Sequence, residues 1–177
     1  MGSDGTHHAD YTKFDGLARE ETLEMLVSSY LALAEGQDNW VCNLANASSL
    51  IWHAYRSLPV DINWAGFYVS KDSTGSELIL GPFQGKVACQ EIKFGVGVCG
   101  TAMKMRETQL VPNVNEFPGH IACDGETKSE IVVPIIGSSG QCHGVLDIDC
   151  LDYDGFTKVD QIYLEKLAYA ISQTCKF

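Results

Sequence analysis

The chain has 177 residues, 45% hydrophobic and 20% charged, which is the composition of an ordinary globular domain with a core large enough to need no disulfide. Its 12 Lys and Arg against 23 Asp and Glu give a net charge of −11, which argues against binding to nucleic acid or to an anionic membrane surface. The polar N-terminus lacks the apolar segment of a secretory leader, and no apolar run reaches the length of a membrane span. We therefore expect a cytoplasmic protein without membrane contact. In that reducing environment thiol pairs tend to be catalytic or regulatory.

Helical periodicity begins after a polar start. We expect residues 1–16 to form a flexible N-terminal tail and residues 17–177 to form one domain. Apolar residues recur at helical spacing over 17–34, and acids occupy the first turns, where the helix dipole favours them. A second helix is predicted over 40–58 and is ended by Pro59.

The middle of the chain is rich in strand signals. Two strands, 63–70 and 76–84, are joined by a Gly-containing hairpin, and 86–94 is predicted as another extended segment. The Gly-rich turn "GVGVCG" then leads into a short helix over 100–106. The remaining predicted elements are a brief strand at 108–111, a strand, turn and strand over 130–150, and a closing helix over 156–174. Because hairpins dominate, we expect an α+β fold with helices packed on a mainly antiparallel sheet.

The stretch "GVLDIDC" places two acids on one face of its predicted strand. Side chains alternate along a strand, so Leu146 and Ile148 face the core while Asp147 and Asp149 share the opposite face. Glu130 opens the partner strand and is expected near Asp149. Close carboxylates repel, and one pKa rises unless a cation or donors compensate. Two interpretations remain open: a pocket for an ammonium group, a metal or a shared proton, or the solvated outer face of a sheet.

Two aromatic residues follow the same alternation in "NWAGFYV". Trp64, Gly66 and Tyr68 share one face of the predicted strand. They could form a ligand platform with a gap at the glycine, or they could simply pack in the core, as aromatic side chains most often do.

The seven cysteines have no metal-site spacing such as Cys-x-x-Cys, so we predict no metal site. Cys99 precedes the predicted helix start, where peptide dipoles favour a thiolate. Cys123 lies in a long polar stretch, 113–129, and is expected to be accessible. Both are candidates for redox chemistry. Buried, inert thiols are expected at Cys42, Cys150 and Cys175.

The motifs also carry a resemblance to a known family. In this order, "NWAGFYV", "LGPFQGKVAC", "GVGVCGTA", "GHIACD", "SEIVVPI" and "GVLDIDC" resemble the free methionine-(R)-sulfoxide reductases, over residues 20 to 175. The resemblance implies a GAF domain over 17–177, with a central antiparallel sheet, helices on one face and a loop-covered ligand pocket on the other. It implies reduction of free L-methionine-(R)-sulfoxide to methionine and no bound cofactor. The implied reductant is thioredoxin, supplied with electrons by NADPH through thioredoxin reductase, and the implied assembly is a homodimer.

The resemblance assigns roles to three cysteines. Cys123 is expected to be the nucleophile that attacks the sulfoxide sulfur and becomes a sulfenic acid. Cys89 is expected to condense with it to a disulfide that thioredoxin reopens. Cys99 is expected to be a second resolving thiol, and it is also the alternative nucleophile.

The resemblance likewise implies a substrate site. Glu130, Asp147 and Asp149 would hold the substrate ammonium and keep one carboxyl protonated as a proton donor. Trp64 and Tyr68 would wall the methyl and sulfur end, and N–H groups of the 95–100 loop would hold the carboxylate. The alternative function is a GAF-type small-ligand or redox sensor without turnover.

Overall fold

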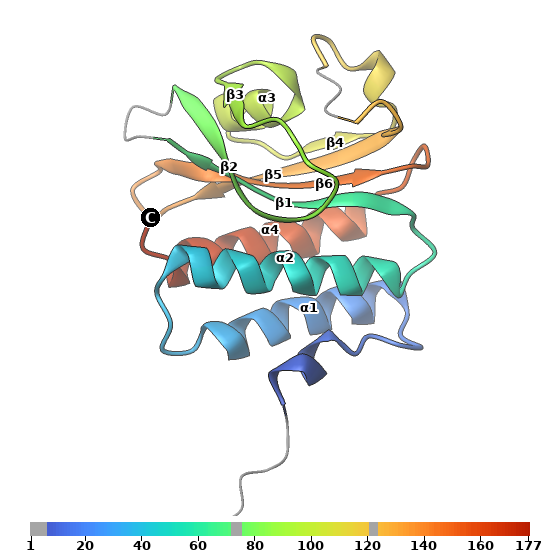
Figure 1. Ribbon diagram of the computed structural model, residues 1–177, viewed down its shortest axis with the longest axis vertical. Coiled ribbons are helices and arrows are strands. Elements are labelled where there is room, and N and C mark those ends of the chain that lie inside the picture. The colour runs from blue at the N-terminus through green and yellow to red at the C-terminus, as the bar shows by residue number, and fades with distance from the viewer. Residues whose placement is uncertain (1–6, 72–75, 121–123) are drawn as a thin grey trace, which may run out of the picture.

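Over the described residues, 7–71, 76–120 and 124–177, the computed structural model has a six-stranded antiparallel sheet at its centre (Figure 1). The strand order is β3-β2-β1-β6-β5-β4. The strands are β1 (Ile62–Ser70), β2 (Glu77–Gly85), β3 (Glu91–Lys93), β4 (Gln109–Val111), β5 (Ser129–Ile136) and β6 (Cys142–Cys150). The predicted antiparallel α+β fold is thus confirmed. Of the predicted extended segment 86–94, however, only the β3 residues pair in the sheet.

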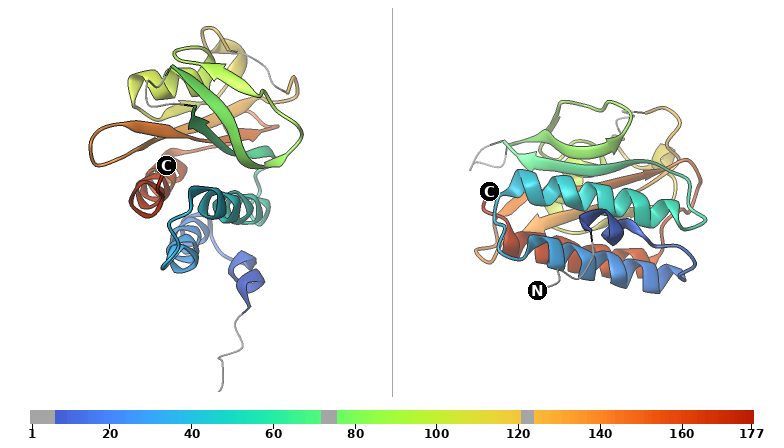
Figure 2. Two further views of the ribbon diagram at one scale, coloured as in Figure 1. Left: turned by 60° about the vertical axis from the view of Figure 1, so that its left-hand side comes forward. Right: turned by 60° about the horizontal axis from the view of Figure 1, so that its bottom comes forward.

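Three long helices cover one face of the sheet. They are α1 (Arg19–Ala34), α2 (Trp40–Arg56) and α4 (Lys158–Thr174). Figure 2 shows α2 and α4 against the sheet and α1 packed beneath them, so the helices themselves form two layers. The larger apolar core lies here and includes Leu146 and Ile148 of β6, as the strand alternation predicted. The helix layer therefore buries the central strands on one face of the sheet and leaves the other face for a site.

The N-terminal segment differs from the predicted flexible tail. A 3-10 helix, η1, spans His8–Thr12, and the Phe14 side chain is 1% exposed within the helical core. A buried phenylalanine side chain contributes about 2–3 kcal/mol. From His8 onward, this segment is therefore part of the fold.

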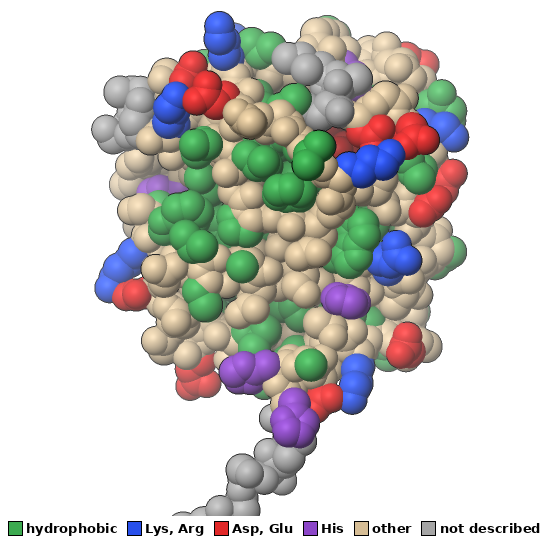
Figure 3. All heavy atoms as spheres, in the orientation of Figure 1, with side chains coloured by type: hydrophobic (Ala, Val, Ile, Leu, Met, Phe, Trp, Pro, Cys, Tyr) green, Lys and Arg blue, Asp and Glu red, His purple; other side chains and the backbone are tan. Residues whose placement is uncertain are grey.

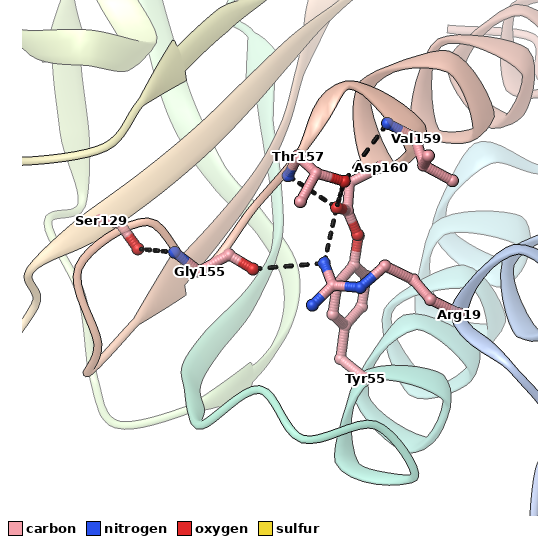
Figure 4. Close-up of polar contacts among 7 residues, drawn as sticks. All are labelled: Arg19, Tyr55, Ser129, Gly155, Thr157, Val159 and Asp160. Carbon is pink, nitrogen blue, oxygen red and sulfur yellow. Dashed lines mark hydrogen bonds and ion pairs between the residues drawn. The ribbon is translucent and has the colours of Figure 1, made fainter.

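A buried ion pair joins the helix layer to the loop that follows β6 (Figure 4). Asp160 is fully buried and accepts from Arg19 Nη1 at 2.6 Å and from the Tyr55 hydroxyl at 2.8 Å. The Thr157 N–H and hydroxyl both donate to Asp160 Oδ2 at 2.7 Å, and these two residues form the capping box at the N-terminus of α4. Arg19 also donates to the Gly155 carbonyl, so this network holds the β6–α4 loop.

The face of the sheet opposite to these helices carries α3 (Gly97–Met105), a 3-10 helix η2 (Val114–Glu116) and the connecting loops. The helix begins three residues earlier than the predicted 100–106. Gly97 adopts a φ of +65°, and a Cβ on Gly100 would lie 2.4 Å from the Lys93 carbonyl oxygen. Only glycines fit this turn, because it folds tightly back onto β3. Cys99 therefore lies inside the first turn of α3.

Charged side chains do not gather into a basic patch on the face drawn in Figure 3, where Lys and Arg lie dispersed and several sit beside acids. Within the described residues, no helix has the length and apolarity needed to cross a membrane.

Candidate functional site

A cavity of about 280 Å³ lies between the sheet, α3 and the loops that cover them. Every predicted site residue in the described ranges lines it: Trp64, Tyr68, Cys89, Cys99, Glu130, Asp147 and Asp149. Cys123 falls within 121–123, outside the described residues. His120 and Asp124, the described residues that flank it, both line the cavity.

The three acids reach the cavity from neighbouring strands. Glu130 of β5 is the cross-strand partner of Asp149 on β6, as the hairpin predicted, and Asp147 lies two residues further along the same face. Glu130 and Asp147 are each 6% exposed. The interpretation of a solvated sheet face is therefore wrong for these two acids. The overlying α3 and loops bury them, which strand alternation alone does not reveal.

Burial controls the protonation of this cluster. It raises the pKa of Asp147 to about 7, against hydrogen bonds from Cys99 and Glu130 that act to lower it. Burial, reinforced by the charges of Asp147 and Asp149, raises the pKa of Glu130 well above its usual range. Burial and the charge of Asp147 also raise the pKa of Asp149. The cluster therefore retains protons at neutral pH, with Glu130 donating a hydrogen bond to Asp147.

Cys99 does not have the thiolate character expected from its position at a helix start. Its side chain is buried, and burial followed by the charges of Asp147 and Glu130 raises the pKa of the Cys99 thiol well above its usual range. The helix dipole, which contributes about 0.3–1 kcal/mol, is outweighed by lost solvation and repulsion between negative charges. One ligand atom each of Cys99, Glu130 and Asp147 lie within 4.8 Å of one another, so these residues could hold a metal ion.

Stacked aromatic rings form the wall at one side of the cavity. The Trp64 and Tyr68 ring centroids lie 5.7 Å apart with an interplanar angle of 22°. Phe83 of β2 also stacks with Trp64, with the ring centroids 5.3 Å apart, a contact that the sequence did not predict. Trp64 and Tyr68 are also buried in the smaller apolar cluster on the cavity side of the sheet. The two rings therefore pack in a core and also line the cavity, so both interpretations of the aromatic pair hold. Trp64 Nε1 is buried with no hydrogen-bond partner among the described residues.

A polar clasp holds the loop that covers the cavity. Asn63 Nδ2 donates to Asp124 Oδ2 at 3.2 Å and to Thr127 Oγ1 at 3.0 Å. Lys86 pairs with Asp124 at 3.3 Å and also with Glu126. The clasp thus joins the segment before Cys89 to the segment after Cys123. Sequence reasoning missed it, because its members are polar residues spread over 65 positions of the chain.

His120 approaches the acids from the same loop. Its Nε2 lies 4.0 Å from Glu130 Oε2. Burial lowers the pKa of His120, so the imidazole is neutral at pH 7 and does not compensate the carboxylates.

The remaining cysteines fall into distinct environments. Cys89 is disulfide-bonded, while Cys42, Cys99, Cys142, Cys150 and Cys175 are free. Cys150 is buried as expected, but Cys42 is exposed on α2, contrary to the prediction of a buried thiol. The prediction rested on the position of Cys42 in a predicted helix, which does not say whether its side chain faces the core.

Comparisons with known proteins agree with this architecture. A sequence profile of the GAF domain matches residues 43–174. The chain is 66% identical over 179 residues to the free methionine-R-sulfoxide reductase of Saccharomyces cerevisiae, covering 100% of this chain and 99% of the yeast protein. It is 46% identical over 136 residues to the free methionine-R-sulfoxide reductase of Escherichia coli, covering 77% and 78% of the two chains.

A solved structure of the free methionine-R-sulfoxide reductase from Neisseria meningitidis, in complex with its substrate, has a TM-score of 0.83 to this chain. The two are 36% identical, and the match covers 91% of this chain and 92% of the other.

Proposed function

The chain belongs to the GAF-domain free methionine-R-sulfoxide reductases, and from that premise we propose how its cavity carries out the reaction. It is an oxidoreductase that converts free methionine-R-sulfoxide to methionine. One observation carries the proposal: Cys99, Glu130 and Asp147 meet within 4.8 Å in a cavity that the Trp64–Tyr68 stack also lines.

The substrate is held at both ends in this proposal. The methyl and sulfur end packs against Trp64 and Tyr68, whose rings supply an apolar surface. The ammonium group is attracted to the acidic cluster, where Asp149 lies beside Glu130. The carboxylate is bound by backbone N–H groups in the first turn of α3. Gly97, Val98 and Cys99 line the cavity, and the first N–H groups of a helix have no carbonyl partner within the helix.

Glu130 is the proposed proton donor to the sulfoxide oxygen. Oxygen is a poor leaving group unless it is protonated, and burial keeps Glu130 protonated at neutral pH. Asp147 accepts the hydrogen bond of Glu130 and orients its proton. A substrate ammonium near Asp149 would favour the charged form of that neighbour without removing the Glu130 proton.

Cys123 is the proposed nucleophile and Cys89 the proposed resolving thiol. The Cys123 thiolate attacks the sulfoxide sulfur, and the oxygen, protonated by Glu130, moves from that sulfur to the Cys123 sulfur. The S–O bond of the substrate and the transient S–S bond both break, so methionine leaves with two more electrons on its sulfur and Cys123 is left as a sulfenic acid. The Cys89 thiol then displaces water and forms the disulfide. The raised pKa of Cys99 argues against the alternative in which Cys99 attacks first. Its place beside the acids remains compatible with a second resolving role.

Thioredoxin, or a thioredoxin-like dithiol protein, is the proposed reductant of that disulfide, with NADPH as the electron source through thioredoxin reductase. The disulfide-bonded Cys89 borders the cavity, where such a partner would reach it. A homodimer and a cytoplasmic location also remain proposals.

The test is NADPH consumption with thioredoxin and thioredoxin reductase, offering the free (R) and (S) epimers separately. We expect turnover of the (R) form alone. Cys123→Ser should abolish turnover while calorimetry still detects substrate binding, and Cys42→Ser, which changes an exposed thiol, should leave the rate unchanged. Activity in Cys123→Ser would return the nucleophile role to Cys99. Turnover with a small dithiol but not with thioredoxin would overturn the proposed partner.

A further inference from the structure

We propose that Cys99, Glu130 and Asp147 form a binding site for a borderline divalent cation, with zinc as the fitting ion, and that its occupation excludes the substrate. The exclusion rests on the proposed function, because the same acids are there assigned to the sulfoxide. The binding itself rests only on the geometry of the three side chains.

The three ligands come from three rigid elements. Cys99 lies in the first turn of α3, Glu130 on β5 and Asp147 on β6, and one ligand atom from each lies within 4.8 Å of the other two. Ligands around a tetrahedral zinc ion, bonded at about 2.0–2.3 Å, lie roughly 3.3–3.7 Å apart. Side-chain rotation without backbone movement can close the difference.

An unpartnered oxygen points to a missing ligand. Asp147 is 6% exposed and lines the cavity, and its Oδ1 is buried with no hydrogen-bond partner in the described part of the chain. A buried carboxylate oxygen without a hydrogen-bond partner destabilises the folded state. Asp149, two residues along the same strand, is a further acid and supplies no positive charge to this oxygen. A dication would supply it.

The donor set selects the kind of ion. One thiolate with two carboxylates suits zinc, whereas Mg²⁺ and Ca²⁺ prefer an all-oxygen shell with six or more ligands. Three protein ligands leave the fourth tetrahedral position open toward the cavity. An ion there would occupy the place of the sulfoxide oxygen and would engage the proton donor Glu130.

The binding test uses the full chain with Cys89→Ser, Cys123→Ser, His7→Ala and His8→Ala, so that the redox thiols and the exposed histidines do not compete for zinc.

Calorimetry with zinc should give one site per chain, and Mg²⁺ should give none. Adding Cys99→Ser or Asp147→Asn should weaken zinc binding by about a hundredfold or more, because loss of a ligand costs more than loss of a second-shell partner, which costs about 10–100-fold. Adding Cys42→Ser should change nothing. Zinc affinity equal in all of these variants, each shown by circular dichroism to be folded, would overturn the site.

Exclusion is measured in the same protein, which cannot turn over. Free methionine-(R)-sulfoxide at saturation should weaken zinc binding severalfold, and zinc should weaken substrate binding by the same factor, since coupling is reciprocal. Independent binding of the two would overturn the exclusion. Wild-type turnover in the presence of a chelator tests the proposed function separately.

Discussion

Two groups of buried acids lie on opposite faces of the same sheet. They differ in how far neighbouring cations and hydrogen-bond donors offset their negative charge. On the helical face, Asp160 is met by the Arg19 guanidinium, the Tyr55 hydroxyl and the Thr157 cap. On the cavity face, Glu130 and Asp147 are buried to a similar degree but are met mainly by each other, by Asp149 and by the Cys99 thiol.

The two regions are adjacent in the chain. Ser129 accepts from the Gly155 N–H at 3.1 Å on the helical face, and the next residue, Glu130, points into the cavity. A buried carboxylate that is paired with a cation and hydrogen-bond donors holds two segments together. Buried carboxyl groups without such partners keep their protons at neutral pH and attract cations. We infer that Asp160 stabilises the fold. The cavity acids lower the stability of the folded state, but they supply the proton and the negative charge that the reaction uses. Four predictions test this contrast.

The largest effect is expected for Glu130→Gln. Glutamine keeps the shape and can still donate a hydrogen bond to Asp147, but it cannot give up a proton, so kcat should fall by about 10²–10⁴-fold. Steady-state kinetics with free methionine-(R)-sulfoxide measures this, and the thermal midpoint should not fall. A loss smaller than tenfold would assign the transferred proton to another acid.

Asp160→Ala should give the reverse pattern, a large loss of stability with little loss of kcat. The substitution leaves the Tyr55 hydroxyl without its acceptor, Arg19 without its carboxylate partner and α4 without its capping box. Removing one member of a buried pair costs about 3–5 kcal/mol. Urea unfolding measures the loss, and kcat is compared below the unfolding temperature. Asp38→Ala, which removes a surface pair with Lys176, is the matched control and should leave stability unchanged. Equal effects of the two substitutions would contradict the contrast.

The third prediction concerns pH. Burial raises the pKa of Asp147 from its ordinary value of 3.8 to about 7, so the folded state binds more protons than the unfolded state between these pH values. The stability that this group contributes is present below pH 4 and is lost as pH rises through 7. Asp147→Asn removes this dependence and should be more stable than wild type at pH 8, by about 4 kcal/mol at most, since each pKa unit corresponds to about 1.4 kcal/mol, and by less where the cluster shares its protons.

Urea unfolding from pH 4 to 8, in the presence of a chelator, measures that difference. The advantage of Asp147→Asn should shrink toward zero at pH 4. A variant that is less stable at pH 8 would mean that the Asp147 carboxylate is compensated after all.

The smallest effect is expected for Lys86→Met, which removes an exposed cation from the clasp over the cavity. Stability should not change, because exposed pairs contribute little. KM should rise severalfold, because the segment around Asp124 is then held mainly by Asn63. High salt should raise the wild-type KM toward that of the variant by screening the Lys86–Asp124 attraction. A KM that is equal in both proteins at low salt would leave the clasp without a role in substrate binding.

Alternation along the strands was enough to predict the faces of the sheet. The Trp64–Tyr68 face and the Asp147–Asp149 face both point to the cavity, and Glu130, which was expected near Asp149, pairs with it. The helix over 100–106 and the tail over 1–16 were predicted less well. The glycine turn before α3 depends on how the chain folds back onto β3, and the burial of Phe14 depends on contacts with helices distant in the chain.

The sequence by itself determined the order of the elements, the face of the strand on which each site residue lies and the family motifs, because these depend on local periodicity and spacing. Tertiary structure alone decided which acids are compensated and which thiol is buried. Arg19 reaches Asp160 across 141 positions, while α3 and the covering loops remove water from Cys99, Glu130 and Asp147. Solvation and long-range pairing set the charge state of a buried group, and neither is encoded in its neighbours along the chain.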